Sequence, residues 1–213
     1  MSPAKRYLFL GSIILTSFSL ALTLLIILSP VIYWLITPIF KLDQIVGLSQ
    51  ADLQTNYLSM WKYLLNPIQT EFTFPNFSAS SQGMQHFAEV KGLMWGNFSM
   101  SIASLFILPK LVQVIRKRRQ KTWFKSQIKL AIVTPLFLLF IALIGFEPLF
   151  IAFHKLFFAN DYWQFDSLKD PIINVLPESF FLLCFLGIIL LYELVVILIS
   201  SRIQAKLKSR RKS

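Results

Sequence analysis

The chain has 213 residues, of which 55% are hydrophobic and only 15% charged, and its mean hydropathy is +0.63. A soluble domain carries about 25% charged residues, so the composition predicts an integral membrane protein. The net charge of +11 predicts no nucleic-acid partner, because the basic residues flank apolar segments, where they set topology and attract anionic lipid. The single cysteine, Cys184, excludes an intramolecular disulfide.

Four apolar segments each have about 22 to 24 residues, enough for a helix to cross the roughly 30 Å hydrocarbon layer. The first exceeds the apolar core of a signal peptide, and no small-x-small cleavage site follows it, so we expect an uncleaved helix. The fold class predicted is an all-α integral membrane protein with four transmembrane helices. The expected spans are about 7–28, 93–115, 128–151 and 179–200.

The orientation of the spans follows from their flanking charges, because Lys and Arg accumulate in short cytoplasmic segments. Fifteen of the 21 basic residues precede span one, lie in or beside the 116–127 loop, or follow span four. Nine of the ten acidic residues, all except Glu193, lie in or beside the other two loops. We therefore expect both termini on the cytoplasmic side.

The two loops predicted to lie outside are 30–92 and 152–178, and we expect them to form a small extracytoplasmic cap. Ser49 and Asp52 match a capping box at the start of an amphipathic helix that ends at Asn66-Pro67. The run 70–74 alternates with period two, which is typical of a strand.

Only two histidines are present, and both are predicted just outside the bilayer on the same side. His86 leads into span two, and Glu89 would share its face on a helix. His154 follows span three, with Glu147 seven residues before it and Asp161 seven residues after it. Each imidazole thus has a nearby carboxylate to fix its tautomer, a pattern that favours general acid–base catalysis over two wetted loop residues.

Other kinds of site are less well supported by the residue pattern. Two histidines and an acid would suffice for an open zinc site, but there is no HExxH or other tight ligand pair, so no metal is expected. A serine hydrolase would need a motif such as GxSxG, which is absent from the sequence. Glu193, inside span four, is expected to pair with Lys110.

Two motifs in the outer segments resemble those of the lipoprotein intramolecular transacylases (Lit) of Gram-positive bacteria. The first is HFAEVK at 86–91, in which Glu89 stands where the family pattern has Asp. The second is FHKLFFANDYW at 153–163, followed by Asp170-Pro171 and by LPESFF at 176–181. The four-span layout and the long first outer loop are similar as well.

The resemblance implies an enzyme of the bacterial cell membrane that needs no cofactor. It would move the sn-2 acyl chain of an S-diacylglyceryl-cysteine lipoprotein to the α-amine of that cysteine, giving the lyso form. Its partners would be diacylglyceryl-modified lipoproteins and the bilayer, with no obligate protein partner. The catalytic residues expected are His86 and His154, on the extracytoplasmic side. Supporting or oxyanion-binding candidates are Glu89, Lys91, Glu147, Asn160 and Asp161.

Two other functions compete with the enzyme. A non-catalytic membrane subunit or immunity-type protein would make the histidines incidental, and the sequence leaves this alternative open. A transporter of charged substrates is disfavoured, because Glu193 is the only acidic or basic residue deep within a predicted span. Direct transfer and an acyl-enzyme intermediate both remain possible for the transacylase.

Overall fold

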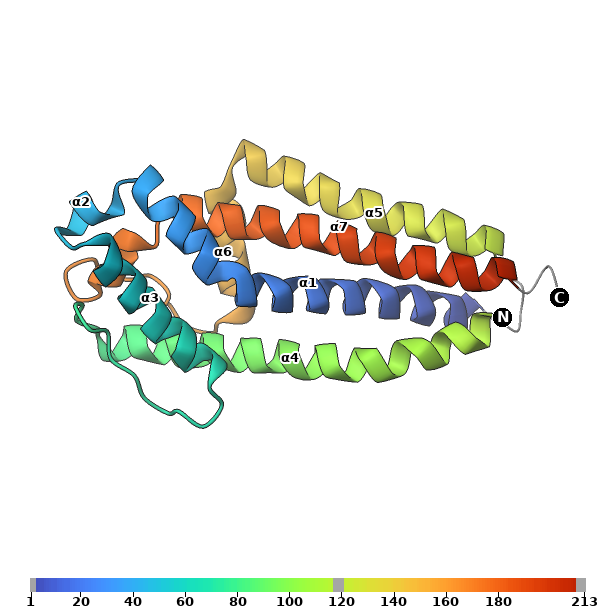
Figure 1. The fold of residues 1–213 in the computed structure, drawn as a ribbon, viewed down its shortest axis with the longest axis horizontal. Helices are drawn as coiled ribbons and strands as arrows, with labels where there is room; N and C mark the ends of the chain where they lie inside the picture. The colour runs from blue at the N-terminus through green and yellow to red at the C-terminus, as the bar shows by residue number, and fades with distance from the viewer. Residues whose placement is uncertain (1–2, 117–120, 210–213) are drawn as a thin grey trace. The chain divides into compact units, whose positions relative to one another are not determined.

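The computed structural model describes residues 3–116 and 121–209, and the regular secondary structure in these ranges is helical, without strands (Figure 1). The all-α prediction is therefore confirmed. Several basic residues used to predict the orientation lie outside the described ranges: Lys117, Arg118, Arg119, Arg210, Arg211 and Lys212.

Four of the described helices are long and apolar enough to cross a membrane, as predicted. They are α1 (Pro3–Ile39), α4 (Ser81–Arg116), α5 (Lys121–Ile144) and α7 (Glu178–Ser209). Their apolar stretches are Arg6–Ile39, Ser81–Lys110, Gln127–Ile144 and Glu178–Ala205.

The first helix is longer than predicted. The sequence indicated a loop from Pro30 onward, but α1 continues through Pro30 and Pro38 to Ile39. A proline removes one backbone hydrogen bond, yet apolar helices tolerate it where packing is favourable. Here Tyr33 and Ile36 follow Pro30 and are buried, so their packing outweighs the lost bond.

The third predicted span, 128–151, is interrupted before its last seven residues. The helix α5 stops at Ile144, Gly145 is extended, and a separate helix α6 (Phe146–Phe157) begins. Pro148 fits a new helix start here, because a proline is tolerated in the first turn of a helix, where its missing N–H would have no partner within that helix. Glu147 and His154 both lie on α6, whereas Asp161 lies beyond its end at Phe157.

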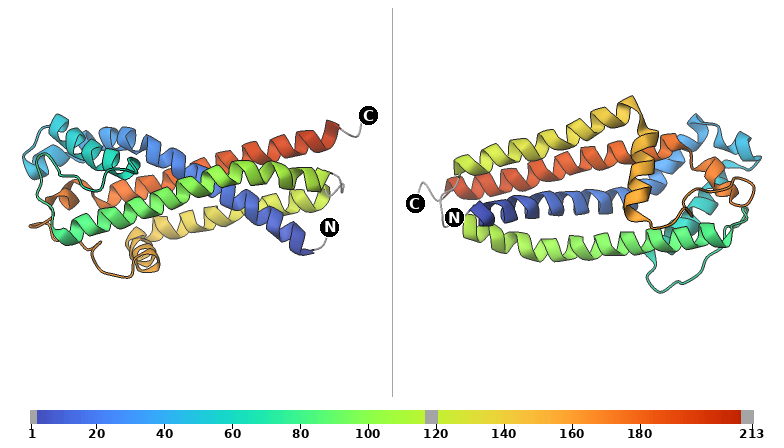
Figure 2. Two further views of the ribbon diagram at one scale, coloured as in Figure 1. Left: turned by 90° about the horizontal axis from the view of Figure 1, so that it is seen from below. Right: turned by 180° about the vertical axis from the view of Figure 1, so that it is seen from behind.

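The described residues form two compact units. The first comprises the described residues within Met1–Leu25, Asn97–Ile141 and Leu186–Ser213, in which segments of α1, α4, α5 and α7 lie side by side (Figure 2). Polar contacts join its helices: for example, Asn97 donates to Thr23 Oγ1 (2.9 Å), and the Tyr192 hydroxyl donates to the Ala131 carbonyl (3.2 Å). Such bonds hold helices together where lipid supplies no hydrophobic drive.

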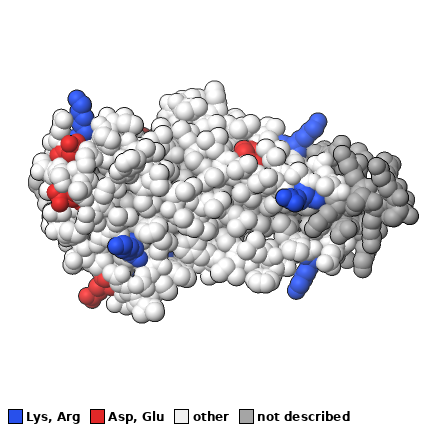
Figure 3. Space-filling model, in the orientation of Figure 1, with Lys and Arg blue, Asp and Glu red and all other residues white. Residues whose placement is uncertain are grey.

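Few charged side chains occur on the face drawn in Figure 3, as expected of a surface in contact with lipid. The predicted Glu193–Lys110 pair does not form. Both carboxylate oxygens of Glu193 are buried and have no hydrogen-bond partner among the described residues.

The second unit contains Ile26–Gly96 and Ala142–Phe185, and its core is aromatic. Tyr33 of α1 stacks on Tyr57 at 4.2 Å between ring centroids, and Phe180 meets both rings edge-on. The unit also includes α2 (Leu42–Val46), α3 (Gln50–Leu65) and the 3-10 helix η1 (Pro171–Val175).

The predicted amphipathic helix in the first outer loop is confirmed as α3. The capping box between Ser49 and Asp52 is complete, and Asn66 ends the helix. The strand-like run 70–74 is irregular, because it has no partner strand among the described residues. The alternating pattern still has a structural consequence, since Phe72 and Phe74 are both buried against the aromatic core.

The capping box makes a prediction about stability. Ser49→Ala removes the acceptor for the Asp52 N–H, so it should lower the free energy of unfolding by about 1 kcal/mol. Thermal denaturation in detergent measures the effect. Thr55→Ala, an exposed change within α3, is the control and should be neutral or slightly stabilising. Equal stability of Ser49→Ala and wild type would contradict the assignment.

Candidate active site

Both histidines lie in the second unit, and the structure brings them together. His86 is in the second turn of α4, and His154 is near the end of α6. Their ring centroids are 5.9 Å apart, and the two residues are only 6% and 8% exposed. Both imidazoles are thus shielded from most of the solvent, and they are close enough for one small substrate to contact both.

Aromatic rings surround the pair. Phe158 lies 4.7 Å from His86 and 5.6 Å from His154, measured between centroids. Trp163 stacks on His154 at 4.6 Å, and Phe165 meets His86 at 5.6 Å. These rings come from the loop that follows α6, so this loop determines the environment of both histidines.

The tautomer of His154 follows from its hydrogen bond. Its Nδ1 lies 2.8 Å from the carbonyl oxygen of Phe150, one turn earlier in α6. A carbonyl oxygen only accepts, so Nδ1 carries the proton and donates it. In the neutral ring Nε2 is then unprotonated and able to accept a proton. The group that orients His154 is therefore a backbone carbonyl rather than the predicted Asp161 carboxylate.

Burial also affects the charge of His154. Desolvation among the aromatic rings lowers its pKa below the ordinary value of 6.5, because the charged imidazolium loses hydration. The hydrogen bond to Phe150 raises the pKa and offsets part of this effect. The ring is consequently neutral at pH 7, the form that accepts a proton.

The surroundings of His86 are less complete. Its Nδ1 is buried and has no hydrogen-bond partner among the described residues. Glu89, one turn later in α4, accepts a bond from Asn160 Nδ2 at 2.8 Å through Oε1, while its Oε2 is buried and unpaired in this part of the chain. Each unpaired buried group costs about 1–3 kcal/mol, so these atoms are suited to meeting polar groups of a ligand.

The remaining predicted residues occupy different places. The Lys91 ammonium donates to the Gln69 carbonyl and lies 4.3 Å from the centre of the Tyr63 ring, so its contacts are with the first outer loop. Asp161 is exposed and accepts a bond from Gln164. Asn160 joins the site through Glu89.

Glu147 lines a pocket of about 500 Å³ beside His154. Phe150 and Trp163, which both contact the His154 ring, form part of its wall. Lys155 and Glu178 add charged groups to a lining that is otherwise mostly apolar. A ligand with an apolar part and a charged amine would match this lining.

The sequence did not reveal every element of this arrangement. The role of the Phe150 carbonyl could not be predicted, because every residue has a backbone carbonyl. Phe158, Trp163 and Phe165 resemble ordinary apolar loop residues in the sequence. Their density within 153–165 was the available sign of a closed aromatic environment. In the described part of the chain, no three His, Cys, Asp or Glu side chains cluster in the manner of metal ligands.

The fold and the site together define a helical integral membrane protein with a buried histidine pair. Residues 7–181 match the family described as lipoprotein intramolecular transacylase Lit. The chain belongs to this family of membrane acyltransferases, as its motifs indicated.

Solved structures agree with this assignment. The chain is similar to the membrane integral lipoprotein intramolecular transacylase Lit from Bacillus cereus, with 28% identity and a TM-score of 0.86 over 99% of this chain and 97% of that one. Two variants of the same protein, with a histidine replaced by arginine or by alanine, match with 26% and 27% identity and TM-scores of 0.77. Their matches cover 98% and 99% of this chain, and 94% and 96% of theirs.

A short segment has a further relative. Over 65 residues, or 30% of this chain, it is 40% identical to a tRNA dimethylallyltransferase from Onion yellows phytoplasma (strain OY-M). The match spans only 20% of that protein's length, so that protein's activity is not carried over to this chain.

The environment of His154 can be tested by titration. Histidine signals followed by NMR in detergent should show His154 with a pKa below 6.5. Trp163→Ala should raise it toward 6.5, because water then reaches the ring. Leu156→Ala, at a residue 76% exposed on the same helix, should leave the pKa unchanged. A wild-type His154 that titrates at or above 6.5 would refute the described burial.

Proposed function

We propose that this protein moves the sn-2 acyl chain of an S-diacylglyceryl-cysteine lipoprotein to the α-amine of the same cysteine. The product is the lyso form, with an N-acyl and an S-monoacylglyceryl group. The observation that carries the proposal is the pair of buried imidazoles, 5.9 Å apart, in a member of the Lit family.

The reaction exchanges one bond for another within a single substrate. The C–N bond of the amide forms, and the C–O bond of the sn-2 ester breaks. The nitrogen gives up a proton, and the departing glyceryl oxygen takes one. No acyl donor, ATP or redox partner is needed, so the protein has to supply positioning and proton transfer.

His154 suits the role of base. Its Nδ1 donates to the Phe150 carbonyl, which leaves Nε2 as an acceptor, and burial keeps the ring neutral. Burial, together with the neighbouring His154, lowers the pKa of His86 to about 4, so this ring holds no extra proton at pH 7. It suits relay of the proton taken by His154, since it can gain a proton on one ring nitrogen and give one from the other to the glyceryl oxygen. Asn160, whose amide has a second N–H besides the one donated to Glu89, is the candidate donor to the oxyanion. The contacts of Lys91 with the first outer loop favour a structural role for that residue.

The pocket beside His154 supports binding of a lipidated N-terminus. Its apolar walls match acyl chains, and the Glu147 carboxylate would attract the cysteine α-ammonium before it is deprotonated. We assign Glu147 to substrate binding on this charge complementarity. Asp161, which turns toward Gln164 in its own loop, has no role in the proposed reaction.

The proposed site belongs on the extracytoplasmic side, with both termini in the cytoplasm. The flanking basic residues support this orientation through the positive-inside rule. The substrate supports it too, because a lipoprotein's modified cysteine lies at headgroup level in the outer leaflet. The second unit, with its outer loops, would then form the extracytoplasmic cap.

The proposed acyl transfer changes the structure of the lipoprotein's N-terminus but not its mass. Co-expression with a diacylglyceryl lipoprotein should convert its N-terminal peptide to an isomer that no longer reacts with amine-specific reagents. Tandem mass spectrometry should place one acyl chain on nitrogen. His86→Ala and His154→Ala should each slow the conversion by about 10²- to 10⁴-fold.

Leu156→Ala, exposed on α6, is the matched control and should convert normally. A free amine that persists with the intact protein would reject the transacylase and favour the non-catalytic subunit. Normal conversion by both histidine variants would keep the activity and reject the mechanism.

The orientation has its own test. In a Cys184→Ser background, Ala79→Cys should react with a membrane-impermeant maleimide on intact cells, because residue 79 is exposed in the first outer loop. Ala205→Cys, exposed near the end of α7, should react only after the cells are permeabilised. The reverse pattern would overturn the predicted topology.

A further inference from the structure

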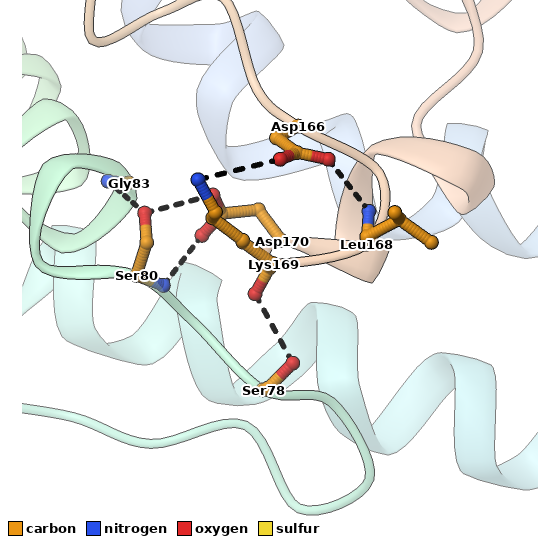
Figure 4. Close-up of polar contacts among 7 residues, drawn as sticks. All are labelled: Ser78, Ser80, Gly83, Asp166, Leu168, Lys169 and Asp170. Atoms are coloured by element: carbon orange, nitrogen blue, oxygen red, sulfur yellow. Dashed lines mark hydrogen bonds and ion pairs between the residues drawn. The ribbon is translucent and has the colours of Figure 1, made fainter.

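Asp170, which the sequence motifs include but no step of the proposed reaction uses, makes two side-chain hydrogen bonds to Ser80 in the second unit. It is 3% exposed. Its Oδ1 accepts from the Ser80 N–H at 2.7 Å, and its Oδ2 accepts from the Ser80 hydroxyl at 2.8 Å (Figure 4). A buried carboxylate with two such bonds is firmly held in place.

These bonds fix the beginning of α4. Ser80 directly precedes the helix, and its hydroxyl oxygen accepts from the Gly83 N–H at 2.9 Å, as an N-cap residue does. The Asp170 charge lies beside the same helix end, where the helix dipole favours an anion. Ser78 adds a second tie by donating to the Lys169 carbonyl at 3.1 Å.

The loop that holds Asp170 is itself ordered. The Asp170 N–H donates to the Asp166 carbonyl at 2.7 Å. The Asp166 carboxylate also accepts from the Leu168 N–H and contacts the Lys169 ammonium at 3.6 Å (Figure 4). Directly after Asp170, η1 begins at Pro171. The carboxylate is therefore presented from a defined turn.

Gly83 provides an independent sign of this close approach. A Cβ at this position would overlap the Asp170 carboxylate and lie 2.9 Å from Cε1 of Phe165. Any larger residue at position 83 would therefore require the Asp170 carboxylate or the Phe165 ring to shift. By contrast, Gly92 of the same helix has open space where a Cβ would be.

The clamp formed by Ser80, Gly83 and Asp170 acts on a histidine. Gly83 and His86 are three residues apart on α4 and share a face. Phe165, which packs where a Gly83 side chain would be, lies 5.6 Å from the His86 ring and 5.5 Å from Phe87. Movement at the clamp therefore changes the position of His86 against the loop that also carries Phe158 and Trp163.

We propose that Asp170 is a positioning residue, which holds the first turn of α4 against the second outer loop so that His86 faces His154. It touches no reacting atom and acts through Ser80. The proposal rests on the proposed transacylase function for its kinetic consequence, although the clamp itself does not depend on that function.

The test compares Gly83→Ala and Asp170→Ala with Gly92→Ala as the matched glycine control. The first two variants should lower kcat about 10- to 100-fold and leave KM within about twofold, because a displaced catalytic group loses alignment more than binding. Gly92→Ala should behave as wild type. Asp170→Asn keeps one acceptor for the Ser80 N–H and should recover part of the kcat that Asp170→Ala loses.

A second measurement is independent of turnover. Carbethoxylation of His86 by diethyl pyrocarbonate, followed by peptide mass spectrometry, should be severalfold faster in Gly83→Ala and Asp170→Ala than in wild type or Gly92→Ala. If Asp170→Ala does not fold, Gly83→Ala and Asp170→Asn decide the question.

Unchanged kcat in Gly83→Ala, unchanged His86 reactivity, or an Asp170→Asn variant as slow as Asp170→Ala would each overturn the proposal. A wild-type protein without transfer activity would instead reject the proposed function, and the carbethoxylation rates would still decide whether the clamp positions His86.

Discussion

The imidazole rings of His86 and His154 have to be held together away from water, and much of the second unit meets this requirement. A buried imidazole is stable only when it is neutral, and its polar nitrogens need partners. His154 meets the constraint through the Phe150 carbonyl, which fixes its tautomer from within the same helix. His86 has no such internal partner among the described residues, so its position depends on the packing around α4.

The aromatic rings and the helix ends follow from the same requirement. Phe158 contacts both imidazoles and excludes water without offering hydrogen bonds of its own. The break at Gly145 separates α6 from α5 and lets α6 place His154 independently of the long apolar helix. Asn160 then connects the loop after α6 to Glu89 of α4. The unpaired atoms of His86, Glu89 and Trp163 all lie in this one region, as expected where a protein keeps polar groups for a ligand.

Some of this arrangement could be predicted from sequence because its signals are local. The apolar lengths predict four spanning helices, and Ser49 with Asp52 predicts the start of α3. The two histidines could be grouped because both border spans on the side poor in basic residues. The helix through Pro30 was missed because the burial of Tyr33 and Ile36 depends on distant packing.

The remaining features are contacts between residues far apart in the chain, which no local pattern encodes. The bonds of Asp170 to Ser80 cross 90 positions, and that of Asn160 to Glu89 crosses 71. The backbone carbonyl that orients His154 could not be predicted from residue types, because every residue has one. Lys91 illustrates the opposite error: a cation beside a histidine motif suggests oxyanion binding, but its long side chain reaches Gln69 and Tyr63 instead.

The lowered pKa of His154 suits the difficult step of the proposed reaction. When an amine adds to an ester, the resulting intermediate expels the amine more readily than an alkoxide, so the nitrogen must lose its proton and the oxygen must gain one. A desolvated imidazole is a modest base, but the nitrogen becomes much more acidic as the C–N bond forms, so a modest base is sufficient. Once protonated, such a ring is a stronger acid than an ordinary histidine. A second imidazole 5.9 Å away provides a route by which the proton taken from nitrogen reaches the glyceryl oxygen, so that both rings are neutral again after each turnover.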